Sequence, residues 1–303
     1  MWGSCFVENI GKLLTQYKFS CDMNPFGILY NPMSIAKAID TLIQGKTYTR
    51  DNLKFYNGLW YSMMHHSSFS SPIQEECLDR INRRITEGIK NIREANWIII
   101  TFGTARVYKW EGEVVGNCHK LPAKQFSREL LTVEEIYTEY GRLAERLRSI
   151  NPDVKFLFTV SPIRHAKDGM HGNQLNKSTL LLAIDQICQS TQQCFYFPSY
   201  EIMMDELRDY RFYNDDMLHP SPLAVNYIWQ QLTASCFETE TIQFMKEWDT
   251  IEKGLNHRPF NPESDSYRRF VSQILLKIEV MKENFPYLDI KNEIKICQAL
   301  LKK

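Results

Sequence analysis

The run Trp97-Ile98-Ile99-Ile100-Thr101-Phe102 is almost continuously apolar and rich in β-branched residues. Such a run is typical of a β-strand with both faces buried, as in the parallel sheet of an α/β protein. It leads directly into Gly103-Thr104-Ala105, a short stretch of small residues. The sequence therefore predicts a buried strand over residues 97–102 with a loop at its carboxyl end.

Further strands and helices alternate along the rest of the chain. Lys155 to Val160 is a second buried strand, and Cys194 to Phe197 is a shorter one. Apolar residues recur at helical spacing in seven segments, which are residues 5–17, 32–42, 74–94, 132–149, 174–191, 200–208 and 222–237. Strands that alternate with helices imply crossover connections, so we expect an α/β fold with a mostly parallel sheet.

Three stretches between these elements are less regular. Lys18 to Met23 predicts a short strand that ends in the turn signal Asn24-Pro25-Phe26-Gly27. Residues 46–75 are rich in Tyr, Trp, Ser and His and are expected to leave the sheet as a long loop, either a substrate wall or a packing insertion. Residues 106–131 are expected to be irregular.

The last part of the chain has a different character. Residues 240–303 are charged and helix-prone and contain no buried-strand pattern. Phe270, Ile274, Ile278 and Met281 recur there at helical spacing. We expect an α/β domain over residues 1–239 and a helical extension over residues 240–303, either packed on the domain or used for homo-oligomer formation.

The composition restricts the partners and the compartment. The 36 basic and 36 acidic residues cancel, so neither a nucleic acid nor an anionic membrane is expected as a partner. The apolar runs are too short to span a bilayer, and no export signal is visible. The eight cysteines have no C-x-x-C pair and are interpreted as reduced thiols. We therefore expect a cytoplasmic protein.

One short stretch predicts half of a nucleophilic site. Asp216 precedes His219 by three residues, so its carboxylate can bond one ring nitrogen and leave the other as a base. A solvated surface turn explains the same spacing. Ser4 lies just before the first helix, where backbone amides and the helix dipole favour negative charge. The alternative for Ser4 is a simple helix N-cap.

Small or polar residues follow every predicted strand. In mostly parallel sheets the working site lies at the carboxyl ends of the strands. The residues at these ends are Asn24 to Gly27, Gly103-Thr104, Ser161 to His165 and Pro198-Ser199, with Gly3-Ser4 at the end of one further strand. This shared placement predicts one site at that edge of the sheet.

Five short motifs occur along the chain in a fixed order. They are Gly3-Ser4-Cys5-Phe6, Asn24-Pro25-Phe26-Gly27-Ile28, Thr101-Phe102-Gly103-Thr104-Ala105, Val160-Ser161-Pro162-Ile163-Arg164-His165 and Asp216-x-x-His219-Pro220. In this order they resemble the GSCFA family, which is related to the SGNH (GDSL-like) hydrolases. The resemblance spans roughly residues 3–237, and the tail is also similar. It implies a flavodoxin-like, three-layer α/β/α fold and a serine hydrolase site.

The resemblance also implies residue roles. Ser4 matches the nucleophile, His219 the base and Asp216 the residue that orients the base. The amides of Ser4 and Gly27 match the oxyanion hole. Where typical SGNH members carry an asparagine, this chain has Thr104. Its hydroxyl can also donate to an oxyanion, but the side chain has a shorter reach. Loss of one oxyanion donor costs about 10²–10³ in rate.

The expected reaction is hydrolysis of a small acyl ester. The resemblance to the family suggests that the acyl group is carried by a saccharide. The residues expected to line the substrate are Asn24, Gly103, Arg164, His165, His65 and His66. A salt bridge under the site is the alternative for Arg164. Cys5 is a rival nucleophile, although a buried Cys5 on the helix face is favoured.

The resemblance includes a second departure. Family members carry a strand before the Gly-Ser motif, in the middle of the sheet, whereas only Met1 and Trp2 precede Gly3 here. We therefore expect a truncated N-terminal strand, or translation that starts upstream.

Other classes of function stay open. A metal site could use His65, His66 and Asp215 or Asp216, but no pair has a familiar metal-ligand spacing, so no metal and no cofactor is expected. A catalytically weak binding or scaffolding domain and an O-acyltransferase are the remaining alternatives.

Overall fold

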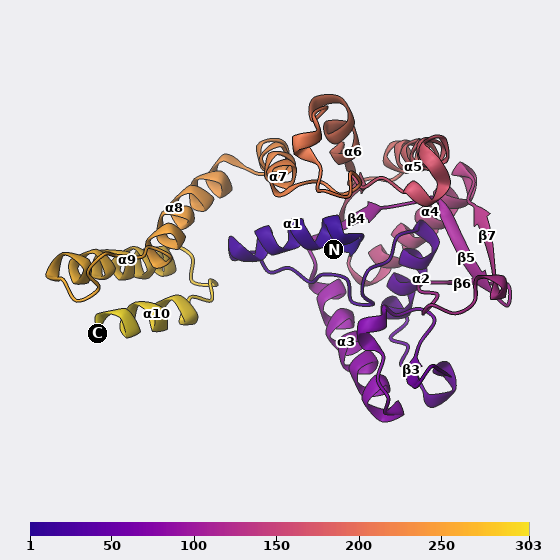
Figure 1. The fold of residues 1–303 in the computed structure, drawn as a ribbon, viewed down its shortest axis with the longest axis horizontal. Coiled ribbons are helices and arrows are strands. Elements are labelled where there is room, and N and C mark those ends of the chain that lie inside the picture. Colours follow the sequence, from indigo (N-terminus) through magenta and orange to yellow (C-terminus); the bar gives the residue numbers. More distant parts are fainter. Residues whose placement is uncertain (303) are drawn as a thin grey trace. The chain divides into compact units, whose positions relative to one another are not determined.

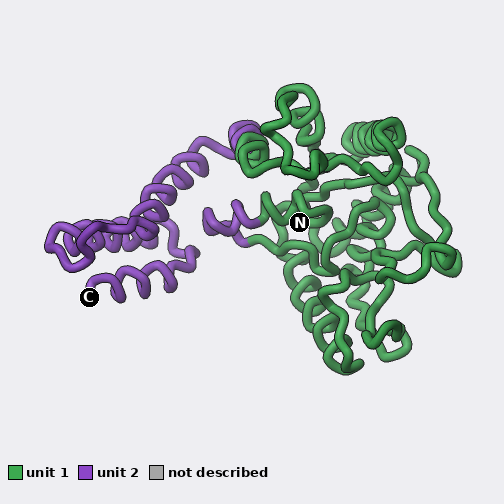
Figure 2. Tube along the Cα trace, in the orientation of Figure 1, with its two compact units in different colours: residues 1–11, 21–229 green, residues 12–20, 230–303 purple. Residues whose placement is uncertain are grey.

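The computed structural model of the chain describes residues 1–302, which fall into two compact units (Figures 1 and 2). The first unit contains residues 1–11 and 21–229, and the second contains residues 12–20 and the chain from residue 230 onward. Helix α1 (Cys5–Gln16) has residues in both units.

The first unit is built on a parallel sheet. Its four strands are β1 (Trp2–Gly3), β4 (Trp97–Phe102), β8 (Lys155–Val160) and β9 (Cys194–Phe197), in the order β1-β4-β8-β9. Every neighbouring pair is parallel. The three strands predicted from apolar runs are confirmed, and β4 lies between β1 and β8. The expectation of an α/β fold with a mostly parallel sheet is therefore confirmed.

Helices connect these strands. In the first unit they are α2 (Pro32–Ile43), α3 (Gln74–Glu94), α4 (Val133–Ile150), α5 (Gly169–Ser190), the short α6 (Ser199–Glu201) and the π-helical turn Ile202–Glu206. Helix α7 (Pro222–Cys236) follows and has residues in both units. Single 3₁₀ turns cover Arg50–Asn52, Ser67–Phe69, Ala123–Gln125, Ala166–Asp168 and Tyr210–Phe212. The long predicted helices are confirmed, although α5 begins five residues before the predicted residue 174.

Two regions expected to be irregular contain antiparallel strands. One is the hairpin β2 (Lys54–Tyr56) and β3 (Leu59–Tyr61). The other is a three-stranded sheet in the order β6-β5-β7, made of β5 (Arg106–Trp110), β6 (Glu113–Val115) and β7 (Phe126–Leu130). The two-residue turns Asn57-Gly58 and Glu111-Gly112 have positive φ throughout, which matches the twist of paired strands.

The strand predicted over Lys18 to Met23 is wrong. That segment contains no strand, and next to it the Asn24 amide donates to the Met1 carbonyl at 2.9 Å. A strand there would pair along β1, but β1 has only two residues and offers almost no ladder to join. As a result, β1 lies at one end of the four-stranded sheet.

The core of the first unit packs against this sheet. Ile100 and Phe102 of β4 and Phe158 of β8 are fully buried, and the rings of Phe102 and Phe158 lie 5.8 Å apart. Ile81 and Ile85 of α3 belong to the same buried cluster. Each such side chain contributes roughly 1.5–3 kcal/mol by burial, so this packing holds the carboxyl ends of β4 and β8 in place.

The second unit is helical. It contains α8 (Thr239–Leu255), α9 (Asp265–Asn284) and α10 (Lys291–Leu301). Ile274, Ile278 and Met281 are buried, which confirms three members of the predicted stripe. A Cβ on Gly254 would lie 2.4 Å from a side-chain carbon of Ile274, so the glycine lets α8 and α9 approach closely.

Within residues 1–302, no helix has both the length and the apolar character needed to cross a membrane.

Candidate active site at the carboxyl edge of the sheet

Ser4 lies between the end of β1 and the start of α1. Its side chain is 1% exposed, and its Oγ accepts a 3.4 Å hydrogen bond from the Phe6 amide, as an N-cap residue would. Gly3 before it has φ of +145°, and a Cβ there would lie 2.4 Å from the Thr101 carbonyl oxygen. Only glycine lets β1 lie this close to β4, so Gly3 is what allows Ser4 to sit at this edge.

The Ser4 hydroxyl contacts another serine. The Oγ atoms of Ser4 and Ser161 are 3.0 Å apart, and Ser161 directly follows β8 and is fully buried. Sequence reasoning did not single out Ser161. Its position in the same strand-exit motif as Arg164 is the signal that would have found it.

Asp216 and His219 form the predicted pair. Asp216 Oδ2 lies 2.5 Å from His219 Nδ1, and its Oδ1 accepts from the backbone amides of Leu218 at 2.9 Å and His219 at 3.0 Å. These bonds, the backbone amides first, lower the pKa of Asp216 to about 2. The carboxylate is therefore ionised at neutral pH and can only accept, so Nδ1 carries the proton and Nε2 is the basic nitrogen.

Arg164 connects the loop of this pair to the end of β8. Its backbone amide donates to the Leu218 carbonyl at 3.2 Å, and its Nη1 lies 3.4 Å from the Met217 carbonyl. Its Nη2 donates to the Tyr213 hydroxyl at 2.7 Å, with the guanidinium 4.2 Å from the centre of that ring. Arg164 thus holds the His219 loop and makes no salt bridge beneath the site in the described part of the chain.

Ser4 and His219 are consequently attached to the same strand end. Ser4 contacts Ser161, and the His219 loop is bonded to Arg164, three residues further along. Within residues 1–302, however, no hydrogen bond joins Ser4 directly to His219.

The second predicted loop approaches the first through Asn24. Asn24 Oδ1 accepts from the Gly3 amide at 2.9 Å. Gly27 has φ of +79°, and a Cβ on it would lie 2.2 Å from the Cβ of His66, which places His66 beside this turn. The Gly27 amide donates to the Asn24 carbonyl at 2.7 Å. The role of the Gly27 amide in an oxyanion hole stays a prediction. In that role the amide would leave the Asn24 carbonyl and donate to the oxyanion instead.

Gly103 and Thr104 are fixed by Tyr30. Their amides donate to the Tyr30 carbonyl at 2.7 and 3.1 Å. The Thr104 hydroxyl donates to Asn176 Oδ1 at 3.3 Å and accepts from the Arg106 amide at 3.1 Å. The Thr104 hydroxyl therefore already has hydrogen-bond partners, and its part in an oxyanion hole stays a prediction.

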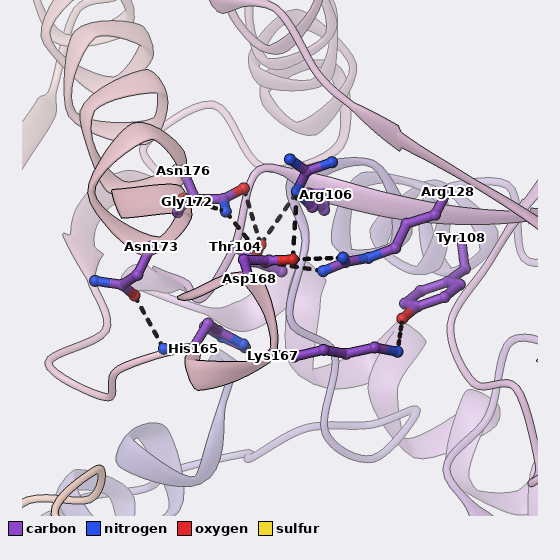
Figure 3. A network of polar contacts seen from close by, with 10 residues as sticks. All are labelled: Thr104, Arg106, Tyr108, Arg128, His165, Lys167, Asp168, Gly172, Asn173 and Asn176. Atoms are coloured by element: carbon purple, nitrogen blue, oxygen red, sulfur yellow. Dashed lines mark hydrogen bonds and ion pairs between the residues drawn. The ribbon is translucent and has the colours of Figure 1, made fainter. Parts of the chain in front are cut away.

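His165 lies beside a network of polar contacts, drawn in Figure 3. Asp168 pairs with Arg106 and bidentately with Arg128, and it accepts from Asn176 at 3.2 Å. His165 itself is anchored through its amide to Asn173 at 2.9 Å.

The His165 ring lies close to several of the residues already described. A Cβ on Gly103 would lie 3.5 Å from its Nε2, and its centre is 6.1 Å from that of the Tyr30 ring. Burial, followed by the charge of Lys177, lowers the pKa of His165 to about 4. His165 is therefore a neutral ring at neutral pH, suited to hydrogen bonding rather than to carrying charge.

His65 does not line a substrate surface, which corrects that expectation. It is fully buried, stacks on Phe26 with ring centres 4.2 Å apart, and bonds Ser62 through Nδ1 at 3.0 Å. Burial lowers its pKa to about 3. The aromatic packing around it, including an edge contact from Tyr48, makes His65 a core residue.

Cys5 is poorly suited to act as the nucleophile. Burial, followed by the nearby charge of Glu8, raises the pKa of its thiol. A raised pKa keeps the sulfur protonated, and the thiol is a much weaker nucleophile than the thiolate.

A buried lysine lies beneath the site. Lys177, on α5, is fully buried, and its Nζ donates to the carbonyls of Gly103 at 2.8 Å and Ser161 at 2.7 Å. Sequence reasoning missed it, because a lysine in a helix normally faces solvent and no local pattern marks this one.

Metal-binding residues are not clustered in this region. Within residues 1–302, no group of three or more His, Cys, Asp or Glu side chains is arranged to hold a metal ion.

Comparison with known families matches both parts of the chain. The family model described as the GSCFA family matches residues 1–232, and the model described as the GSCFA domain protein, C-terminal domain, matches residues 248–303. No curated protein and no solved structure gives a significant match. Since the first match alone covers more than half of the 303 residues, the chain belongs to the GSCFA family.

Proposed function

We propose that this chain is a serine ester hydrolase of the SGNH type that removes small acyl groups from a saccharide or a similar small molecule. The observation that carries the proposal is the Asp216–His219 pair. An ionised carboxylate bonded to Nδ1 at 2.5 Å leaves Nε2 as a base, on a loop bonded to the strand end that also contacts Ser4.

The reaction proceeds through an acyl-enzyme. Ser4 Oγ attacks the ester carbonyl carbon while His219 Nε2 accepts the hydroxyl proton. Collapse of the tetrahedral intermediate expels the alcohol, which takes that proton from His219. Water then attacks the acyl-enzyme with His219 again as the base, releasing the acid and restoring Ser4.

The oxyanion is held by the amides of Ser4 and Gly27, with the Thr104 hydroxyl assisting. Before substrate binds, the Gly27 amide and the Thr104 hydroxyl donate to Asn24 and Asn176 respectively. Substrate binding must therefore reorient these groups, because a donor that stays engaged stabilises the transition state less.

A second candidate is a binding or scaffolding domain with weak or no catalysis. It is favoured by one observation, which is that the Ser4 hydroxyl contacts Ser161 and not His219. An O-acyltransferase uses the same acyl-enzyme and differs only in resolving it with an acceptor hydroxyl instead of water.

Hydrolysis of a small aryl acetate by the full chain tests the proposal. We expect turnover by the unmodified protein, a change of less than about threefold in Cys5→Ala, and a loss of about 10⁴-fold or more in Ser4→Ala. No turnover by a protein shown to be folded contradicts the hydrolase and supports the binding domain. Acylation of an added sugar at the expense of hydrolysis identifies a transferase.

A further inference from the structure

Lys177 is an unusual residue to find in the interior of a protein. Its side chain is fully buried, and within residues 1–302 its ammonium makes no ion pair with a carboxylate. Burial of an unpaired charge is costly, and here it lowers the pKa of Lys177 to about 7. The ammonium finds two carbonyl acceptors and the face of Tyr200, whose ring centre is 5.3 Å away.

The two carbonyls mark where Lys177 acts. Gly103 is the first residue after β4, and Ser161 is the first residue after β8. Lys177 therefore joins the exits of two adjacent parallel strands at the edge that carries the site. Its bond to the Ser161 backbone fixes the same residue whose hydroxyl lies 3.0 Å from Ser4 Oγ.

We propose that Ser161 and Lys177 are positioning residues for the Ser4 nucleophile. The Ser161 hydroxyl orients the Ser4 hydroxyl, and Lys177 fixes Ser161 by bonding its carbonyl and that of Gly103 together. This inference rests on the proposed function, but the effect of Lys177 on the distance between the Ser4 and Ser161 hydroxyls can be measured without any turnover.

A second serine provides a matched control. Ser199 is as fully buried as Ser161, and its Oγ donates to the Val160 carbonyl at 2.6 Å and lies 2.5 Å from Thr159 Oγ1. It makes no hydrogen bond to Ser4 in the described part of the chain. Ser199→Ala therefore removes a comparable buried hydroxyl near the same strand end without touching the nucleophile.

The first test is the rate of covalent labelling by a fluorophosphonate. We expect labelling to be about tenfold slower in Ser161→Ala, which corresponds to one hydrogen bond, and unchanged in Ser199→Ala. In ester hydrolysis the same loss falls on kcat, with KM unchanged. A rate in Ser161→Ala equal to or above that of the unmodified protein overturns the positioning role, provided that Ser4→Ala abolishes labelling.

The second test separates Lys177 from general stability. We expect labelling about tenfold slower in Lys177→Met, as in Ser161→Ala, because Ser161 is then no longer fixed by its carbonyl. The double variant Lys177→Met/Ser161→Ala should be no slower than Lys177→Met alone, since Lys177 acts through Ser161. If the double variant instead shows the product of the two single-variant losses in labelling rate, the link between Lys177 and Ser161 is overturned. If Lys177→Met does not fold, the contrast between Ser161→Ala and Ser199→Ala still decides the role of Ser161.

Crystal structures distinguish failure of this inference from failure of the proposed function. In Lys177→Met we expect the Ser4 and Ser161 hydroxyls to separate beyond hydrogen-bonding distance, whereas Ser199→Ala keeps them in contact. An unchanged Ser4–Ser161 pair in Lys177→Met overturns the inference even if Ser4 is catalytic. If the unmodified protein is never labelled, the proposed function fails, and this structural comparison still tests the positioning.

Discussion

Ser4 and His219 are held in opposite ways. Ser4 is 1% exposed and lies where a strand meets a helix, so core packing fixes its backbone. The His219 side chain is 41% exposed and lies in a loop whose order comes from hydrogen bonds to Asp216 and Arg164. The proposed nucleophile is thus part of the folded core, whereas the proposed base is presented by an exposed loop that hydrogen bonds hold in place. Changes in the loop should alter activity with little effect on stability.

The largest expected effect tests the loop directly. His219→Ala removes the base and should lower the rate of ester hydrolysis about 10⁴-fold or more, with the melting temperature nearly unchanged. His171→Ala is the control, since His171 is an exposed histidine of α5. A large drop in the melting temperature of His219→Ala contradicts the view that the loop is independent of the core.

Asp216→Asn sharpens the comparison within the loop. The amide oxygen can still accept from the backbone, but the charged acceptor for His219 Nδ1 is lost, so we expect the rate to fall about 10²–10⁴-fold. Asp215→Asn, one residue earlier, should change the rate less than about twofold. Equal losses in the two variants, measured by the same assay, would mean that the loop acts only through its overall charge.

Two glycines with the same backbone angle separate strain from site geometry. Gly27 and Gly58 both have φ of +79°, but a Cβ on Gly27 would meet His66 at 2.2 Å, whereas nothing lies within 4 Å of one on Gly58. Gly58→Ala should lower the free energy of unfolding by roughly 1–2 kcal/mol without changing activity. Gly27→Ala should cost more and also slow hydrolysis, as followed by denaturant unfolding and kinetics. Identical behaviour of the two variants would remove Gly27 from the site.

A further prediction concerns acid stability. The pKa values of the buried ring of His65 and the partly buried ring of His165 are lowered to about 3 and about 4, so both stay neutral in the folded protein while the unfolded chain takes up protons below about pH 6.5. The stability associated with these neutral rings is fully present at neutral pH and is lost as the pH falls below about 6.5. Between about pH 7 and about pH 5 each should lower the free energy of unfolding by about 2 kcal/mol.

His65→Phe isolates one of these contributions. Phenylalanine keeps the stacking on Phe26 but does not titrate, so the decrease in stability with acidification should be smaller in the variant, as measured by denaturant unfolding at each pH. The exposed His171→Ala variant should keep the full decrease. An unchanged pH dependence in His65→Phe would mean that His65 is not held neutral.

Local patterns predicted much of this fold. The run Trp97–Phe102 predicted β4, which has a neighbouring strand on each side. Helical periodicity predicted α3 and α4 to within a residue or two. The hairpin of β2 and β3 was missed even though Asn57-Gly58 is a strong hairpin signal, because its strands have only three residues each. The strand expected over Lys18 to Met23 failed because its pairing depended on the length of β1.

Individual contacts of the site were predictable only where they are local. The Asp216–His219 bond spans three residues, so spacing alone indicated it. Ser4 and Ser161 are 157 residues apart, and Lys177 reaches Gly103 across 74. The shared placement of strand ends indicated that Ser4 and Ser161 lie at one edge of the sheet, but it revealed neither their direct contact nor the contact of Lys177 with Gly103. Likewise, nothing in His65-His66 distinguishes the buried ring from its neighbour, because burial there is decided by the packing of Phe26 and Tyr48.

The most direct test of the account is the position of the covalent adduct after reaction of the full chain with a fluorophosphonate, read by peptide mass spectrometry. We predict a single modified residue, Ser4, with modification lost in Ser4→Ala, strongly slowed in His219→Ala and retained in Cys5→Ala. An adduct on Cys5 or any other residue, or no adduct on a folded protein, would contradict the assignment of Ser4 and His219 as nucleophile and base.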